Sequence, residues 1–239
     1  MLTALVVGGC SGTAQTVKES SKAEYHGLYT PSNTANVQKE LNTNHPDYDW
    51  GLWGHNLGKI IQDDATDDMY AMVDGKRNKK QLCFSSDDLY KAVRSYIIDQ
   101  YGYGTDEYSE RISIMPMDNK MACTCAKCKA KGNTDTNATP AVSDFVSRLA
   151  NEFPKHNFYT SAYHTTKAVP AKPLPQNVGV FISSVSMQMR IDFSNAKGYT
   201  EFVSMVKEWK KKCDRILVWD YERNFDDYLS PFPCLLAMQ

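Results

Sequence analysis

The chain has 239 residues, which is enough for one large domain with a substantial hydrophobic core. Its 27 lysines and arginines nearly balance 28 aspartates and glutamates, and the resulting net charge of −1 provides no general attraction to nucleic acid phosphates or anionic lipid. Because no apolar run approaches the roughly 20 residues that cross a bilayer, we expect no transmembrane span. These properties disfavour dedicated nucleic-acid-binding proteins and membrane-spanning proteins.

The first residues resemble a lipoprotein signal. Residues 2–9 are apolar or small, Cys10 follows them, and a polar stretch begins at Ser11. The segment lacks the basic residues with which such signals begin, and a short buried strand followed by a Gly-Gly turn is the alternative explanation. Under the first interpretation, Cys10 carries a lipid anchor, and the protein belongs to the cell envelope as a periplasmic or surface lipoprotein.

The segment from Ser11 to Asp49 is rich in threonine, serine and asparagine and shows little apolar periodicity. Such a composition predicts irregular or extended chain. We therefore divide the chain into a signal-like and irregular segment, residues 1–49, and a structured domain, residues 50–239.

Helices and strands alternate over the second part of the chain. Serines before Asp87, acidic residues after them and apolar residues at helical spacing predict a helix over residues 86–101. Thr139 as N-cap and Pro140 at the first helical position predict a helix that ends near Pro154. A third helix is predicted over residues 199–212. The predicted strands are the apolar runs at residues 111–116, 157–163, 178–183 and 215–220.

Apolar strands separated by amphipathic helices are typical of a parallel sheet covered on both faces, so we expect an α/β fold. The glycines between Gly8 and Gly12 match neither the dinucleotide-binding nor the P-loop spacing, which disfavours a nucleotide-binding sheet. Polar and aromatic residues follow successive strands, where barrel enzymes assemble their sites, and this favours a (β/α)8 barrel of TIM type. A full barrel with its loops uses about 250 residues. Because the first 49 residues here look irregular and only four strands are evident, we expect an incomplete barrel. The residues at the strand ends are Asp118, Asn119, Tyr163, His164, Ser183, Ser184, Asp220 and Tyr221.

Three of the seven cysteines form the compact motif C-x-C-x2-C at Cys123, Cys125 and Cys128. This spacing is typical of thiolate ligands of zinc, and it predicts a structural zinc ion as the one candidate cofactor. Three sulfurs do not close a tetrahedral site, so a fourth ligand is expected from Cys83, Cys213 or a histidine. A disulfide within the cluster and free thiols in a loop are the alternatives.

Five segments in chain order resemble the bacterial domain-of-unknown-function 4838 family. They are Trp53-Gly-His55-Asn56-Leu, Met117-Asp118 with the cysteine motif, Ser161-Ala-Tyr163 with Pro170 and Pro173, Asn177-Val, and Val218-Trp-Asp220-Tyr221 with the following residues to Pro233. The family is related to α-glucuronidase-like and hexosaminidase-like glycoside hydrolases. The resemblance covers about residues 50–239. It implies a TIM-barrel carbohydrate-active protein, typically exported by Bacteroidetes, whose substrate is not defined for the family. Because the family usually extends further at both ends, the resemblance also implies a partial copy of its barrel.

Glycoside hydrolysis by such a protein requires two carboxyl groups, unless the substrate supplies the nucleophile itself. Asp118 and Asp220 are the candidate catalytic residues, because each follows an apolar strand at the edge where a barrel presents groups to its ligand. The alternative for Asp118 is a residue that caps its own loop. The alternative for Asp220 is an ion pair with Arg215 or Arg223.

A second set of residues could bind the sugar. Its members are Trp53, His55, Asn56, Asn119, Tyr163, His164 and Tyr221. His55 and Asn56 could hydrogen-bond sugar hydroxyls or orient a carboxylate, and aromatic rings such as Tyr163 could stack on the apolar face of a sugar. Structural roles in the core are the alternative, above all for Trp219 inside its strand. The leading hypothesis is a glycoside hydrolase; a noncatalytic glycan-binding envelope protein and a zinc-stabilised structural module are the alternatives.

Overall fold

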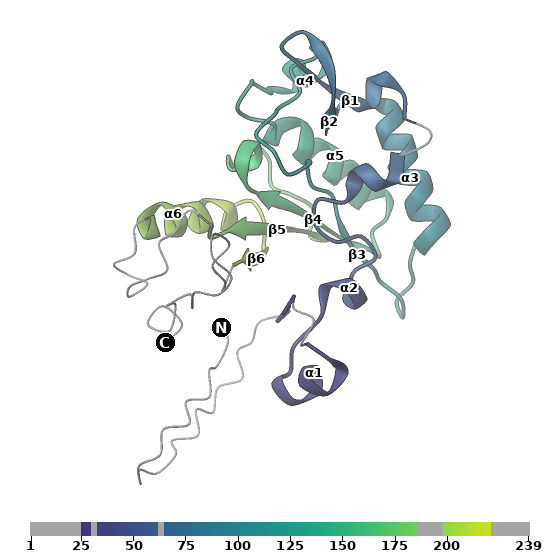
Figure 1. Cartoon of the computed structure of the whole chain (residues 1–239), viewed down its shortest axis with the longest axis vertical. Helices are drawn as coiled ribbons and strands as arrows, with labels where there is room; N and C mark the ends of the chain where they lie inside the picture. The colour runs from purple at the N-terminus through teal and green to yellow at the C-terminus, as the bar shows by residue number, and fades with distance from the viewer. Residues whose placement is uncertain (1–24, 30–32, 62–64, 186–197, 221–239) are drawn as a thin grey trace, which may run out of the picture.

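The computed structural model describes residues 25–29, 33–61, 65–185 and 198–220, and these residues form a mixed α/β fold (Figure 1). The predicted anchor residue Cys10 and the predicted sugar-binding residue Tyr221 lie outside the described residues. None of the described helices has the length and the apolar character needed to cross a lipid bilayer.

A parallel sheet of four strands lies at the centre of the fold. Its strands, in hydrogen-bonded order, are β3 (Arg111–Ser113), β4 (Asn157–Ala162), β5 (Val178–Ser183) and β6 (Arg215–Trp219). All four predicted strands are therefore present, and each begins at its predicted residue. β3 ends earlier than predicted, although Ile114 and Met115 beyond its end are fully buried. A parallel bridge between Leu52 and Ile112 places an additional segment beside β3.

The two faces of this sheet pack against different partners, because successive side chains of a strand point to opposite sides. One face packs on helix α6 (Tyr199–Lys210); the buried cluster there contains Ala162, Val180, Ile182, Phe202, Trp209 and Cys213. The other face carries an aromatic cluster of Trp50, Met115, Tyr159 and Phe181, with Trp53, Leu217 and Trp219 packed against it. Among the described residues, helices cover one face of the sheet and aromatic side chains cover the other. The prediction that helices cover both faces is therefore not met in this part of the chain.

The three predicted long helices are present as α3 (Asp87–Tyr101), α5 (Thr139–Glu152) and α6. Ser86 caps α3, since its Oγ accepts a hydrogen bond from the Leu89 amide at 3.2 Å. The N-cap of α5 is Ala138 and not Thr139 as predicted. The Thr139 hydroxyl donates instead to the Ala168 carbonyl oxygen at 2.9 Å, so it fastens the helix to the chain that follows β4.

The main hydrophobic core lies between these helices and the sheet. α3 contributes Leu89, Val93 and Ile97, all fully buried, and α5 contributes Phe145 and Leu149. These positions recur at helical spacing, and this recurrence is why both helices were predictable from the sequence.

Two short helices interrupt the segment that was expected to be irregular. They are α1 (Ala35–Leu41) and α2 (Pro46–Asp49). α1 has no buried residue, so it lacks the apolar stripe from which a helix is predicted. Just before α1, the Asn33 side chain donates hydrogen bonds to the carbonyl oxygens of Leu28 and Asn44.

An antiparallel hairpin of β1 (Tyr70–Val73) and β2 (Lys76–Leu82) was not predicted. Its two-residue turn is Asp74-Gly75, and both residues have positive φ, 50° and 76°. Asp-Gly is a strong signal for such a turn, but β2 is mostly charged and lacks the apolar alternation expected of a strand. The remaining short elements are α4 (Ala126–Lys131) and the 3-10 helices η1 (Leu57–Ile61), η2 (Asp67–Met69) and η3 (His164–Thr166).

Candidate functional site

The loop after β3 brings Asp118 close to the end of β4. Asp118 Oδ1 lies 3.7 Å from Nε2 of His164, which begins η3 directly after β4 and Tyr163. The Asp118 side chain is 62% exposed, whereas that of His164 is 24% exposed. Because β3 and β4 are parallel neighbours, their carboxyl ends meet at one edge of the sheet, and the two predicted site residues are adjacent there.

His164 has an uncommon backbone conformation and a lowered pKa. Its φ of 48° lies in the left-handed region, and its ring stacks on Tyr163 with centroids 3.7 Å apart. Burial lowers the pKa of His164, and the negative charge of Asp118 opposes this shift only in part. The imidazole is therefore predominantly neutral at neutral pH, and it can accept or donate a hydrogen bond without carrying a charge.

His55 reaches the same edge from the segment beside β3. Its Nδ1 lies 2.6 Å from the carbonyl oxygen of Pro116. Because a carbonyl oxygen only accepts, Nδ1 carries the hydrogen, and Nε2 of a neutral ring remains as an acceptor. Gly54, with φ of 64°, turns the chain between Trp53 and His55, and a Cβ there would lie 3.6 Å from the Trp219 ring.

Stacked and tilted rings connect these residues into a continuous surface at the carboxyl edge. Trp53 stacks on Trp219 with centroids 5.0 Å apart, and His55 lies 6.0 Å from the rings of both Trp219 and Tyr163. Each of these rings is partly exposed. We call this surface the aromatic row, and its members are Trp53, Trp219, His55, Tyr163 and His164.

A cleft of about 330 Å³ opens beside the row, on the side of the segment that pairs with β3. Trp53 and Asn56 border it, as do Trp50, Lys59 and Tyr96. Its volume is at the lower end of the range typical of ligand pockets, about 300–1,000 Å³. The Asn56 amide donates to the Trp53 carbonyl oxygen at 2.5 Å, so this predicted sugar-binding residue also fixes the turn that carries Trp53.

Asp220 lies at the end of β6, next to the end of β5. It accepts a hydrogen bond from the hydroxyl of Ser184, which is 2% exposed, whereas Asp220 is exposed. Arg215, which was one alternative partner for this carboxylate, donates to the side chain of Asn157. The structure thus places Asp118 and Asp220 at the carboxyl ends of β3 and β6, the two outer strands of the four.

Asn119 is engaged with the hairpin. Its Oδ1 accepts from the Gln81 side chain at 3.0 Å and its Nδ2 donates to the Lys80 carbonyl oxygen at 2.7 Å. Asn119 therefore holds the Asp118 loop against β2, a contact between distant segments that sequence spacing does not predict.

The cysteine motif is the third predicted group. Its fourth cysteine is Cys83, which directly follows β2. Atoms Sγ of Cys83, Cys123, Cys125 and Cys128 all lie within 4.8 Å of one another. Cys83 Sγ lies 3.7 Å from Cys125 Sγ and 3.8 Å from Cys128 Sγ, far beyond the disulfide length of about 2.05 Å. Cys213, another candidate for the fourth position, donates from its Sγ to the Val178 carbonyl oxygen instead. We call these four residues the cysteine cluster.

The cluster is chemically a set of sulfur donors in a shielded site. Cys83, Cys123 and Cys128 are buried and Cys125 is half-buried. Cysteines bind metal ions as thiolates, so a cation held by these four sulfurs would replace their protons.

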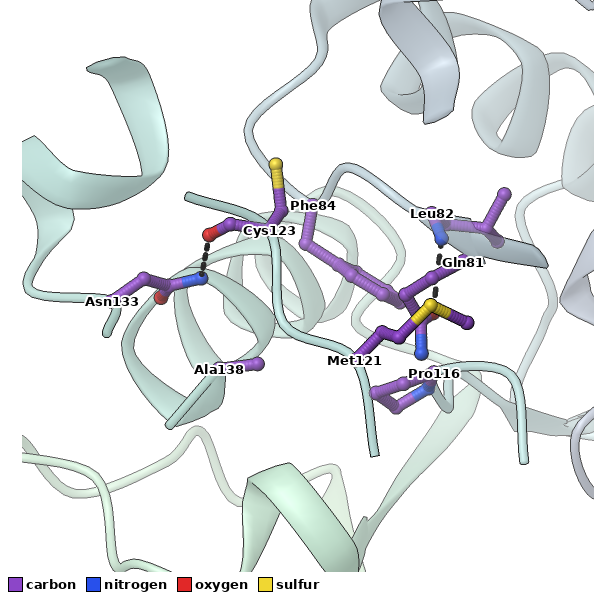
Figure 2. A pocket seen from close by; sticks show the side chains of 8 residues that line it. All are labelled: Gln81, Leu82, Phe84, Pro116, Met121, Cys123, Asn133 and Ala138. Atoms are coloured by element: carbon purple, nitrogen blue, oxygen red, sulfur yellow. Dashed lines mark hydrogen bonds between the residues drawn. The ribbon is translucent and has the colours of Figure 1, made fainter. Parts of the chain in front are cut away.

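A small cavity is lined by Cys123 of the cysteine cluster and by Pro116 and Met121, which flank Asp118 in the chain (Figure 2). Its volume of about 10 Å³ suffices for at most one water molecule, so it is no sugar site. Asn133 borders it and donates from Nδ2 to the Cys123 carbonyl oxygen at 3.1 Å. The other amide atom, Oδ1, accepts from the Ala141 amide at 3.0 Å, so Asn133 ties the cysteine loop to α5.

Comparison with known proteins adds a family assignment to this geometry. No curated protein and no solved structure shows significant similarity to the chain. The family model described as Domain of unknown function (DUF4838) matches residues 12–239, and the match thus includes most of the segment before residue 50. Because the match covers nearly the whole sequence, the chain belongs to the DUF4838 family.

Proposed function

We propose that this protein binds a poly- or oligosaccharide at the carboxyl edge of its parallel sheet and hydrolyses a glycosidic bond there. The observation that carries the proposal is the aromatic row, which ends beside the carboxylate of Asp118. Partly exposed rings stack on the apolar face of a sugar, and imidazole, phenol and carboxylate groups can hydrogen-bond its hydroxyls.

The proposal includes a (β/α) barrel of which the four strands form part. Their spatial order follows the chain order, as in a barrel, whereas a doubly wound sheet reverses direction at a switch point. Packing of helices on one face and of large side chains on the other is the arrangement of a barrel wall. In a barrel enzyme the site lies at the carboxyl ends of the strands, which is where the aromatic row and both aspartates lie.

Asp118 and Asp220 are the proposed acid and base groups. Asp118 is bordered by the partly buried imidazole of His164, and Asp220 accepts from the buried hydroxyl of Ser184, so the two carboxylates have different surroundings. Different surroundings are what allow one carboxyl group of a glycosidase to remain protonated while the other is ionised.

The test is reducing-end release from a panel of host and plant glycans. Asp118→Asn and Asp220→Asn should each lower the hydrolysis rate by about 100-fold or more, as expected for loss of an acid or base. Asp106→Asn is the matched control, because Asp106 lies exposed in the loop before β3 and pairs there with Lys155, which follows α5. Unchanged hydrolysis in both site variants would rule out these roles.

A noncatalytic glycan-binding protein is the second candidate, because the aromatic row alone suffices for binding. It predicts glycan-array binding that Trp219→Ala abolishes, with no reducing ends released by the unmodified chain. A zinc-stabilised structural module is a third candidate, and the four sulfurs of the cysteine cluster favour it.

We also propose export to the cell envelope with a lipid anchor at Cys10. The apolar and small residues before Cys10 support this proposal. Incorporation of a labelled fatty acid in cells, lost in Cys10→Ser, is the expected result; equal labelling of both chains would contradict it.

A further inference from the structure

We propose that Cys83, Cys123, Cys125 and Cys128 bind one zinc ion as a closed tetrathiolate site that fastens the β1–β2 hairpin to the loop carrying Asp118. This site is the zinc-stabilised module named above with its full set of four ligands, and zinc binding there does not depend on glycan binding.

The spacing of the sulfur atoms supports tetrahedral coordination. All four Sγ atoms lie within 4.8 Å of one another, and Cys83 lies 3.7 Å and 3.8 Å from Cys125 and Cys128. Four sulfurs at about 2.3 Å from a zinc ion occupy the corners of a tetrahedron with edges of about 3.8 Å. The cluster therefore needs little rearrangement to accept the ion, and four protein ligands leave no open position for chemistry.

Hydrogen bonds to the sulfurs provide a second, independent observation. The Met72 amide donates to Cys123 Sγ at 3.2 Å, and the Cys128 amide donates to Cys125 Sγ at 3.5 Å. Backbone amides aimed at sulfur orient thiolate ligands and stabilise their negative charge. Four thiolates around Zn²⁺ leave two negative charges, and these amide hydrogen bonds would offset part of that charge.

The site joins segments that are distant in the sequence. Cys83 and Cys125 are 42 residues apart; Cys83 follows β2, and Cys125 is the N-cap of α4. Thr124 already contacts the hairpin, because its amide donates to the Met72 carbonyl oxygen at 2.9 Å. A metal ion held by both segments would turn these contacts into a cross-link.

The cross-link also bears on the Asp118 loop. Cys123 follows this loop in the chain. At the other end of the loop, Met117 and Asn119 are hydrogen-bonded to Lys80 and Gln81 of β2, shortly before Cys83. Both flanks of the loop therefore lead to cysteines of the cluster. Loss of the ion should release the loop from the hairpin, and the pairing of Asp118 with His164 should weaken as a result.

The test measures zinc in the full chain, purified from zinc-supplied cells without chelator, by elemental analysis and native mass spectrometry. We expect one zinc ion per chain, and loss of this ion in Cys83→Ser and in Cys128→Ser. Cys213→Ser is the matched control: Cys213 is buried like the ligands, lies outside the cluster, and donates a hydrogen bond that a serine hydroxyl can also make. Retention of stoichiometric zinc in Cys83→Ser would overturn the proposed ligand set.

A measurement on the unmodified chain keeps the proposal testable if the variants do not fold. Replacement of zinc by Co²⁺ should produce the intense thiolate charge-transfer absorption and the visible bands of a tetrahedral sulfur site. Zinc removal by chelator should make four additional thiols reactive in the folded chain. A zinc-free chain in which peptide mapping finds disulfides among the four cysteines of the cluster would overturn the inference.

Discussion

The side chain of Gln81 in β2 forms two hydrogen bonds with the backbone of Met117, one as acceptor and one as donor. Its Oε1 accepts a hydrogen bond from the Met117 amide at 3.0 Å, and its Nε2 donates to the Met117 carbonyl oxygen at 3.2 Å. The residue is 2% exposed. Gln81 therefore acts toward the loop as a neighbouring strand would, and it couples the position of Asp118 to the hairpin.

Gln81→Leu should lower the free energy of unfolding by about 1–3 kcal/mol, because the amide and carbonyl groups of Met117 lose their partner. Equilibrium unfolding in urea measures this change. Gln100→Leu is the control, because Gln100 lies exposed on α3; its effect should stay within about 0.5 kcal/mol. Equal stability of the two variants would contradict the role of Gln81.

The pKa of His164, measured by NMR titration, should lie below the ordinary value of 6.5 because burial disfavours the charged ring. Asp118→Asn should lower this pKa further, because the Asp118 charge favours the imidazolium. A rise of the pKa in this variant would contradict the proximity of the two side chains.

The same shift predicts a pH dependence of stability. As pH falls below about 6.5, the unfolded chain takes up a proton at His164 more readily than the folded chain does, so folding loses stability. The contribution of His164 is fully present above that pH and is lost as pH falls toward the lower pKa of the folded state. His164→Gln should weaken this dependence in urea titrations between pH 5 and pH 7.5; an unchanged slope would count against it.

Trp53 and Trp219 should show energetic coupling, because their rings stack with centroids 5.0 Å apart and planes 19° apart. A double-mutant cycle of Trp53→Leu and Trp219→Leu should show a coupling energy of about 0.5–1.5 kcal/mol. Trp209 provides the control pair with Trp53, because it lies in the buried cluster on the helix-covered face. Strict additivity in the first pair would disprove the stacking.

The thiol of Cys213 should be unreactive in the folded chain. Burial raises its pKa to about 11, so at pH 8 the thiolate that reacts with iodoacetamide is scarce, on the order of 0.1%. Peptide mass spectrometry should find Cys213 unmodified in buffer and modified in urea. Rapid labelling of the folded chain would show that Cys213 is not buried in the cluster beneath α6.

The pattern of apolar residues located the elements that bury many apolar side chains and missed those that bury few. β5 was predicted with its observed bounds, Val178–Ser183, because its side chains are almost uniformly apolar and a proline-rich link precedes it. α1 was missed because it buries none of its seven residues. The hairpin was missed because β2 is rich in lysine and arginine, although its Asp-Gly turn could have indicated it.

The sequence by itself determined the α/β class, the four parallel strands and a cysteine motif suited to a metal, because apolar periodicity and short-range spacing are properties of the local chain. Only the tertiary structure decided which distant residues meet. Parallel pairing of β3 and β4 places Asp118 beside His164, and the hairpin brings Cys83 to within 3.7 Å of Cys125. These contacts depend on how strands pair and loops close, and no local pattern in the sequence encodes a distance between segments that only folding brings together.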